Sequence, residues 1–193
     1  LKKKKKMKKM KNKIILASSS PRRKELFDKY GIDYTVDFVE TEEVLDESLT
    51  LFKRLENIAL QKAKPLQIKY PNNIIVSADT MVTFQDEMLG KPKNREDAKR
   101  MLELLSNNKQ VVITAVCIIK DQQSTTFTDA TTVTFKKLSD QEIEDYLDTN
   151  EWQGKAGAYA IQGVASKFVE KIDGDLENVI GMPTVSYTHL TLP

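Results

Sequence analysis

The sequence contains a single cysteine and a single histidine among 193 residues, which disfavours several kinds of catalytic site. Cys117 cannot form an internal disulfide, and its place in the apolar run VVITAVCIIK predicts a packed strand residue. His189 stands alone near the C-terminal end, so catalysis through a histidine base and histidine-rich metal sites are both disfavoured. Any chemistry must therefore depend on carboxylates, lysines, arginines and hydroxyl groups.

Two phosphate-binding fingerprints are also absent. The sequence has neither the GxxxxGK[ST] pattern of P-loop enzymes nor the GxGxxG pattern of dinucleotide-binding enzymes, so neither class is supported. No apolar run is long enough to span a membrane, and no secretory-signal core follows the N-terminal lysines. We therefore expect a cytoplasmic protein without a membrane partner.

Positive charge is concentrated at the N-terminal end of the chain. Residues 1–13 hold nine of the 30 lysine and arginine residues, which leaves 21 basic against 28 acidic residues in the rest. Such a segment could bind nucleic acid or an anionic membrane. It lacks aromatic residues that stack on bases and an apolar face that inserts into lipid. We expect a disordered tail with no specific nucleic-acid partner.

Strand-like and helix-like segments alternate after this tail, which predicts an α/β fold. Strands are expected at 13–18, 33–39, 73–84, 109–121 and 124–137, and helices at 20–31, 49–69, 94–106 and 139–149. The last two strands are expected to form a hairpin through the sequence DQQ. Ser139 and Glu142 predict a capping box, whereas the glycine-rich residues 154–175 predict loops.

No repeat or linker divides the chain, so we expect one domain over residues 14–184. The C-terminal sequence VSYTHLTLP, residues 185–193, has no helical periodicity. We therefore expect an atypical tail there without a closing helix, and we assign no function to His189.

The sequence SSSPRR places two arginines in the first turn of a helix. Ser20 is a suitable N-cap and Pro21 suits the first helical position. Arg22 and Arg23 then lie at the positive end of the helix dipole, which disfavours cations. Either an anion binds there, held by backbone N–H groups, serine hydroxyls and both guanidinium groups, or both arginines are solvated surface residues.

A carboxylate interrupts the apolar strand NIIVSADTMVTF. Asp79 would be costly there unless it is paired or metal-bound, so it is a candidate general base or metal ligand with Thr80 beside it. The alternative is a turn in which Asp79 caps the backbone. Glu42 and Glu43 follow an earlier strand and could add oxygen ligands for Mg²⁺ or Mn²⁺, or they could simply be solvated.

Three lysines and a glutamine could complete such a site. Lys91 lies between a turn and a proline, Lys62 lies on the long helix, and Lys155 is flanked by small residues. Each lysine alone suits a solvated surface, but together with the arginines and carboxylates they fit a polyphosphate site. Gln162 could read a base edge or could be a solvated loop residue.

The motifs LASSSPRRKELF, ETEE, QKA, SADTMV, LGKP, VITAV and KAGAYAIQG, in this order and spacing, resemble the Maf family of nucleoside triphosphate pyrophosphatases. The resemblance covers about residues 14–184. It implies a two-lobed, inosine-triphosphatase-like α/β fold on a long mixed sheet with a central cleft. It also implies hydrolysis of a nucleoside triphosphate to the monophosphate and pyrophosphate with a divalent cation, Mg²⁺, Mn²⁺ or Co²⁺.

Site roles follow from the resemblance position by position. It implies that Asp79 is the catalytic aspartate. As a hypothesis on the mechanism, we expect Glu43 and Asp79 to hold the metal. The phosphate-binding and catalytic polar residues are expected to be Ser18, Arg23, Glu43, Lys62 and Lys91, and the residues that set substrate choice Arg22, Thr80 and Gln162.

The last three residues resemble the family branch that acts on dTTP and UTP, including modified pyrimidine nucleotides, in a house-cleaning role. The alternatives are the branch that acts on 7-methyl-GTP and a non-catalytic regulator of septum formation. A homodimer is a possible assembly. The chain departs from the family pattern at Gly154, where many relatives have an acidic residue. It also departs after GMP, where the family usually has a closing helix and no helix is expected in this chain.

Overall fold

The protein was analysed as a computed structural model that describes residues 13–40, 42–85 and 87–191. The expected basic tail, except for Lys13, lies outside these residues. Within them, no helix is long and apolar enough to cross a lipid bilayer.

Seven strands of the described chain form one mixed sheet, in the order β2-β1-β3-β5-β6-β7 with β4 paired to β3. The two parallel pairs join β1 (Ile14–Leu16) to β2 (Tyr34–Val36) and to β3 (Ile74–Phe84). The other pairs are antiparallel and involve β3, β4 (Glu87–Leu89), β5 (Lys109–Lys120), β6 (Gln123–Phe135) and β7 (Val169–Asp173). The hairpin predicted through DQQ is confirmed, with Asp121 and Gln122 at φ 50° and 67°.

The helices begin close to where the sequence places their caps. They are α1 (Pro21–Lys29), α2 (Leu51–Lys69), α3 (Arg95–Leu105) and α4 (Asp140–Asp148). The predicted capping box of α4 is confirmed, and the bonds that Glu142 accepts from the Ser139 backbone and Lys136 lower the pKa of its carboxyl to about 2. Pro21 opens α1 as predicted, but the Ser20 side chain makes no capping bond.

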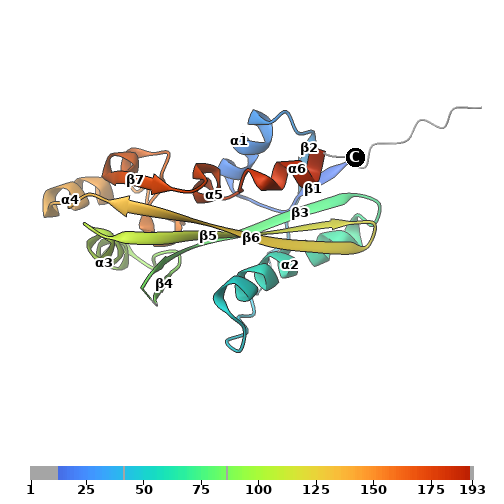
Figure 1. The fold of residues 1–193 in the computed structure, drawn as a ribbon, viewed down its shortest axis with the longest axis horizontal. Helices are drawn as coiled ribbons and strands as arrows, with labels where there is room; N and C mark the ends of the chain where they lie inside the picture. The colour runs from blue at the N-terminus through green and yellow to red at the C-terminus, as the bar shows by residue number, and fades with distance from the viewer. Residues whose placement is uncertain (1–12, 41, 86, 192–193) are drawn as a thin grey trace, which may run out of the picture.

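Helices and loops cover both faces of the sheet and gather into two lobes along the long strands (Figure 1). α1, α2, β1 and β2 lie toward one end of the long strands, and α3, α4 and β7 lie toward the other end. On one face α2 packs Leu55 and Ala59 against Ile75 and Cys117, where burial raises the pKa of the Cys117 thiol to about 11. The predicted α/β fold with a long mixed sheet is confirmed.

Two expectations about the C-terminal part of the chain are wrong. Residues 154–175 are not only loops, because they contain the 3₁₀ turns Ala156–Ala158 and Val164–Phe168 as well as β7. After α5 (Leu176–Ile180), the segment Val185–Thr191 forms the helix α6, although no helix was expected there. Tertiary contacts compensate for its weak periodicity, since His189 stacks on Phe127 with ring centroids 5.0 Å apart.

Candidate active site

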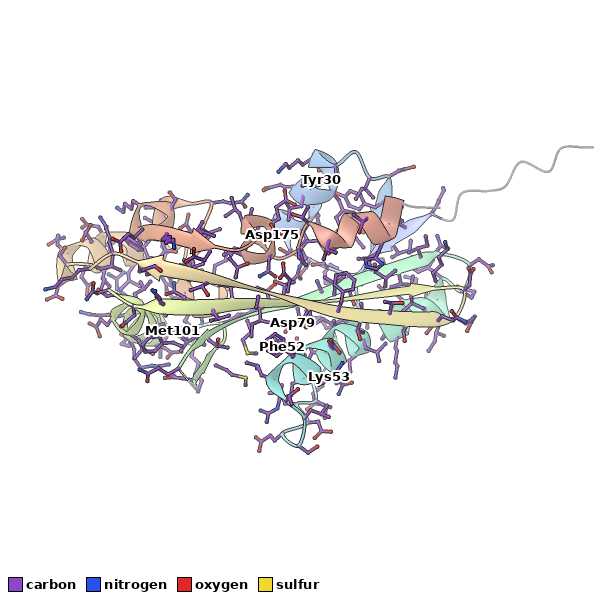
Figure 2. The ribbon with its side chains drawn as sticks, viewed as in Figure 1. Tyr30, Phe52, Lys53, Asp79, Met101 and Asp175 are labelled. Carbon is purple, nitrogen blue, oxygen red and sulfur yellow. The ribbon has the colours of Figure 1, made fainter. Side chains whose placement is uncertain are left out.

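A gap along one edge of β3 positions the site. On that edge β1 pairs with β3 as far as Val76, and β4 begins to pair with it at Val82. Between these points no strand of the described chain covers the edge of residues 77–81. A cavity of about 870 Å³ opens there, and in Figure 2 Asp79 lies near the middle of the long sheet. This is the predicted central cleft.

Eight of the nine predicted site residues line the cavity; they are Ser18, Arg22, Arg23, Glu43, Lys62, Asp79, Thr80 and Lys91. Gln162 is exposed and does not line it, whereas its neighbour Ile161 does. Lys155, a candidate from the sequence, also lines the wall. Four cavity residues were not predicted from the sequence, namely Ser19, Phe38, Glu40 and Tyr159. Ser19 lies within SSSPRR, Phe38 lies within the predicted strand 33–39, and Glu40 directly follows that strand.

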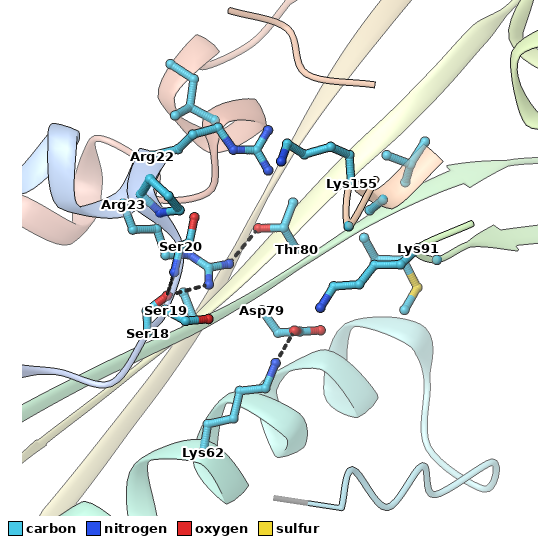
Figure 3. A pocket seen from close by; sticks show the side chains of 18 of the residues that line it. Ser18, Ser19, Ser20, Arg22, Arg23, Lys62, Asp79, Thr80, Lys91 and Lys155 are labelled. Carbon is cyan, nitrogen blue, oxygen red and sulfur yellow. Dashed lines mark hydrogen bonds and ion pairs between the residues drawn. The ribbon is translucent and has the colours of Figure 1, made fainter. Parts of the chain in front are cut away.

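Alternation along β3 sends neighbouring side chains to opposite faces of the sheet. Asp79 points to the face covered by α2, where its Oδ1 accepts a hydrogen bond of 2.5 Å from Lys62 Nζ. Thr80 points to the other face, where its Oγ1 accepts a hydrogen bond of 3.1 Å from Arg23 Nη2. Figure 3 shows both contacts at the cavity. The site therefore has a carboxylate, Asp79, on one face of the sheet and an arginine, Arg23, on the other face.

Two carboxylates converge on Lys62. Its Nζ lies 2.5 Å from Asp79 Oδ1 and 2.9 Å from Glu43 Oε1, so the two acidic side chains already share one cation. Within the described residues no group of three histidine, cysteine or acidic side chains could form a complete metal cage. Mg²⁺ needs no such cage, because one or two carboxylates together with substrate phosphates commonly bind it. The donors Glu43 and Asp79 fit that kind of site.

The segment that carries Glu43 is fastened along α2. Asp37 Oδ2 accepts a hydrogen bond of 2.6 Å from Lys69 Nζ, at the C-terminal end of the helix. The Gln61 side chain donates to the Val44 carbonyl and accepts from the Val44 N–H, both at 3.0 Å. Gln61 precedes Lys62 on the helix, and Val44 follows Glu43. This pair of hydrogen bonds therefore fixes the position along α2 at which Glu43 meets Lys62.

Arg23 is held by the protein through all three nitrogens of its guanidinium group. Nε donates to the Gly181 carbonyl at 2.8 Å, Nη1 to Ser18 Oγ at 3.2 Å and Nη2 to Thr80 Oγ1 at 3.1 Å. Burial lowers the pKa of Arg23 to about 10, an effect that nearby Asp79 partly offsets. Arg23 is thus charged at neutral pH and fixed in place, with two of its five N–H groups left for a ligand.

A chain of hydroxyl groups supports Thr80 from behind. Thr80 Oγ1 lies 2.9 Å from Thr114 Oγ1, and Thr114 donates its hydroxyl hydrogen to the Asn178 carbonyl at 2.8 Å. Because that hydrogen is already used, Thr80 must donate to Thr114 and accept from Arg23. This leaves Thr80 no hydrogen for a substrate, and its geometry here is that of a support for Arg23.

Small residues allow the loop that carries Lys155 to approach the sheet. Gly157 has φ +68°, and a Cβ on it would lie 3.0 Å from Val82 Cγ2, so the backbone itself packs on β3. Farther along the chain, a Cβ on Gly163 would overlap the carboxylate of Glu151, which accepts a hydrogen bond of 2.9 Å from the Val164 N–H. The loop is therefore fixed at both ends of KAGAYAIQG.

Comparisons with known proteins match the chain to a family and to several relatives. The family described as Maf-like protein matches residues 13–191. A dTTP/UTP pyrophosphatase of Acholeplasma laidlawii is 45% identical over 173 residues, which are 88% of this chain and 90% of that protein. A dTTP/UTP pyrophosphatase of Bacillus velezensis is 44% identical over 174 residues, 90% of this chain and 92% of that protein.

Among solved structures, the Ham1 protein of Staphylococcus aureus matches with a TM-score of 0.43 and 15% identity over 64% of this chain and 72% of that chain. The family match spans the sheet, the cavity wall and every predicted site residue. By that match, the chain belongs to the Maf family.

Proposed function

We propose that this protein hydrolyses nucleoside triphosphates, with dTTP and UTP as preferred substrates, to the monophosphate and pyrophosphate. The observation that carries the proposal is the gathering of Arg22, Arg23, Lys62, Lys91 and Lys155 around Asp79 in one cavity. Several cations and one carboxylate suit a polyanionic substrate that is attacked by water. The pyrimidine preference rests on the relatives described as dTTP/UTP pyrophosphatases.

In this reaction Asp79 accepts a proton from the attacking water. Its Oδ1 is bonded to Lys62, which leaves Oδ2 for the water. Attack at the α phosphorus forms a new P–O bond and breaks the bond to the bridging oxygen between the α and β phosphorus atoms. The electron pair leaves on pyrophosphate. Arg23 and Lys91 stabilise the charge that develops on the phosphate oxygens.

Glu43 and Asp79 would hold a divalent cation, Mg²⁺, Mn²⁺ or Co²⁺, together with the substrate phosphates. When bound, that cation would neutralise phosphate charge and polarise the bond that breaks. Lys62 would then keep the two carboxylates close to each other despite their like charges.

One experiment tests the reaction and the substrate class together. The full chain is incubated with dTTP, UTP, dCTP, 7-methyl-GTP and modified pyrimidine triphosphates in ¹⁸O-labelled water, with each of the three cations. We expect pyrophosphate rather than orthophosphate, ¹⁸O in the monophosphate, and the highest kcat/KM for dTTP and UTP. Label in pyrophosphate would contradict attack at the α phosphorus. A higher rate with 7-methyl-GTP would favour the other branch, and no turnover would favour a non-catalytic regulator.

Three further expectations stay predictions. They are a cytoplasmic location, the absence of a specific nucleic-acid partner, and a homodimeric assembly.

A further inference from the structure

Two cations face each other at one end of the cavity without a carboxylate between them. Figure 3 shows the guanidinium group of Arg22 and the ammonium group of Lys155 pointing toward one another. In the described part of the chain neither side chain has an ion pair. The Lys155 ammonium has one long hydrogen bond, 3.5 Å to the Gln153 carbonyl.

The other cations of the cavity wall are better accommodated. Lys62 is paired with two carboxylates, and Arg23 donates to three oxygen acceptors. Lys91 is exposed to solvent and points toward Asp79 in Figure 3. Arg22 and Lys155 are both partly buried, so their charges are not fully hydrated, and neither has a carboxylate in contact within the described chain.

Electrostatics agrees with this geometry. Burial lowers the pKa of Arg22, and burial followed by repulsion from Arg22 lowers the pKa of Lys155. Glu151 partly offsets the effect at both side chains. Because its carboxylate is bonded to the backbone of Val164, it balances these charges from a distance rather than in contact. An anion that binds between the two cations would offset the remaining free-energy cost of their burial and mutual repulsion.

We propose that Arg22 and Lys155 form the subsite for the terminal pyrophosphate group, the β and γ phosphoryl groups, of a nucleoside triphosphate. The inference rests on the proposed function. A triphosphate has two groups beyond the reacting α phosphorus, a neutral nucleoside and a strongly charged pyrophosphate. The unpaired cations favour the charged one. Arg22 would then act on the phosphate chain and not on the base, unlike the role expected from the resemblance.

The nucleoside would then lie in another part of the cavity. Phe38 and Val39 also line the cavity and are 47% and 45% exposed, so their apolar side chains are accessible to a ligand. An aromatic ring at this position could stack on a base. The proposal therefore gives the substrate a direction, with pyrophosphate at Arg22 and Lys155 and the base near Phe38.

Product binding tests the subsite directly. Inorganic pyrophosphate and dTMP are titrated separately into the full-length protein and its Lys155→Met variant by calorimetry, with and without Mg²⁺. We expect the dissociation constant for pyrophosphate to rise about 10-fold or more, because a bond to a charged group is lost. The dissociation constant for dTMP should change less than about 2-fold.

Controls separate this effect from a general loss of charge or fold. Lys93→Met removes the same charge from an exposed lysine that does not line the cavity, and it should leave both dissociation constants unchanged. Lys155→Arg should restore pyrophosphate binding. If Lys155→Met does not fold, Lys155→Gln and Arg22→Gln replace it. In a double-mutant cycle, Arg22 and Lys155 should be coupled for pyrophosphate and not for dTMP.

Three results would overturn the proposal. They are weaker binding of dTMP with unchanged binding of pyrophosphate, equal effects on both ligands, and no effect of either substitution. A change in the kcat/KM ratio of dTTP to dCTP with unchanged pyrophosphate binding would instead return Arg22 to a role in base selection. Since these titrations need no turnover, failure of the proposed hydrolysis would be recognised separately, by the absence of pyrophosphate release in the wild-type protein.

Discussion

The cavity wall has two parts that carry similar charge but differ in how that charge is held. In one part, Arg23 and Lys62 make short contacts with protein oxygens, among them Thr80 Oγ1 and Asp79 Oδ1. In the other, Arg22 and Lys155 face each other without an ion pair in the described chain. Arg22 and Arg23 are neighbours in the first turn of α1, where successive side chains point about 100° apart around the helix axis. This rotation separates a cation that the protein already holds from one that a ligand must complete.

The largest effect on turnover is expected from a substitution of Asp79, which lies in the part of the wall where Arg23 and Lys62 are held by protein oxygens. Asp79→Asn keeps the size of the side chain but removes the proton acceptor, and kcat should fall by about 10²- to 10⁴-fold. Pyrophosphate release at saturating dTTP measures this loss, and circular dichroism checks the fold. An Asp79→Asn variant that turns over at the wild-type rate would remove Asp79 from the catalytic role.

Arg23→Lys should have the next largest effect, because one ammonium group cannot reproduce three bonds made by a planar guanidinium group. We expect kcat/KM to fall by about 10²-fold and the free energy of unfolding to fall by about 1–3 kcal/mol. The matched variant Arg22→Lys should leave the free energy of unfolding within about 0.5 kcal/mol of wild type. Equal destabilisation by the two substitutions, measured by urea unfolding, would contradict the comparison.

Thr114→Val tests the support behind Arg23. The substitution keeps the shape of the side chain but leaves the Thr80 hydroxyl and the Asn178 carbonyl without their buried partner. We expect a loss of about 1–3 kcal/mol, which is a decrease in Tm of about 2–4 °C per kcal/mol for a chain of this size. Thr125→Val is the control, because Thr125 is an exposed residue of β6. A Thr114→Val variant as stable as Thr125→Val would show that the hydroxyl chain contributes little.

Much of the fold could be predicted from the sequence, because its signals are local. The hairpin, the capping box of Ser139 and Glu142, and the start of α1 at Pro21 each depend on neighbouring residues. The helix α6 could not be predicted, since its contact between His189 and Phe127 joins distant segments. The short strand β4 was missed for the same reason, because it exists through its pairing with β3.

The site residues could be predicted as a set, but their relations could not. The motifs indicated Asp79, Thr80 and Arg23, and alternation along a strand already places Asp79 and Thr80 on opposite faces. What the sequence does not show is that β1 and β4 leave the edge of β3 uncovered at these residues, because that depends on long-range strand pairing. Gln162 was placed in the site by its motif, but it is exposed in the structure and does not line the cavity. The sequence does not distinguish Lys155 from the other lysines, because the position of Arg22 opposite it depends on the tertiary fold.

The smallest expected effect is a pH dependence of the free energy of unfolding, which arises from Lys155 in the part of the cavity wall that lacks ion pairs. The pKa of Lys155 is lowered in the folded protein, so the unfolded chain binds more protons between this lowered pKa and the ordinary value of 10.5. The contribution of Lys155 to the free energy of unfolding should therefore rise with pH across that window. Lys155→Met should be slightly more stable than wild type at neutral pH, and this difference should disappear as the pH approaches 10.5. Urea unfolding of both proteins from pH 7 to pH 10.5 measures the difference, with Lys93→Met as the control. A difference that does not change with pH would mean that Lys155 affects stability through packing and not through its unbalanced charge.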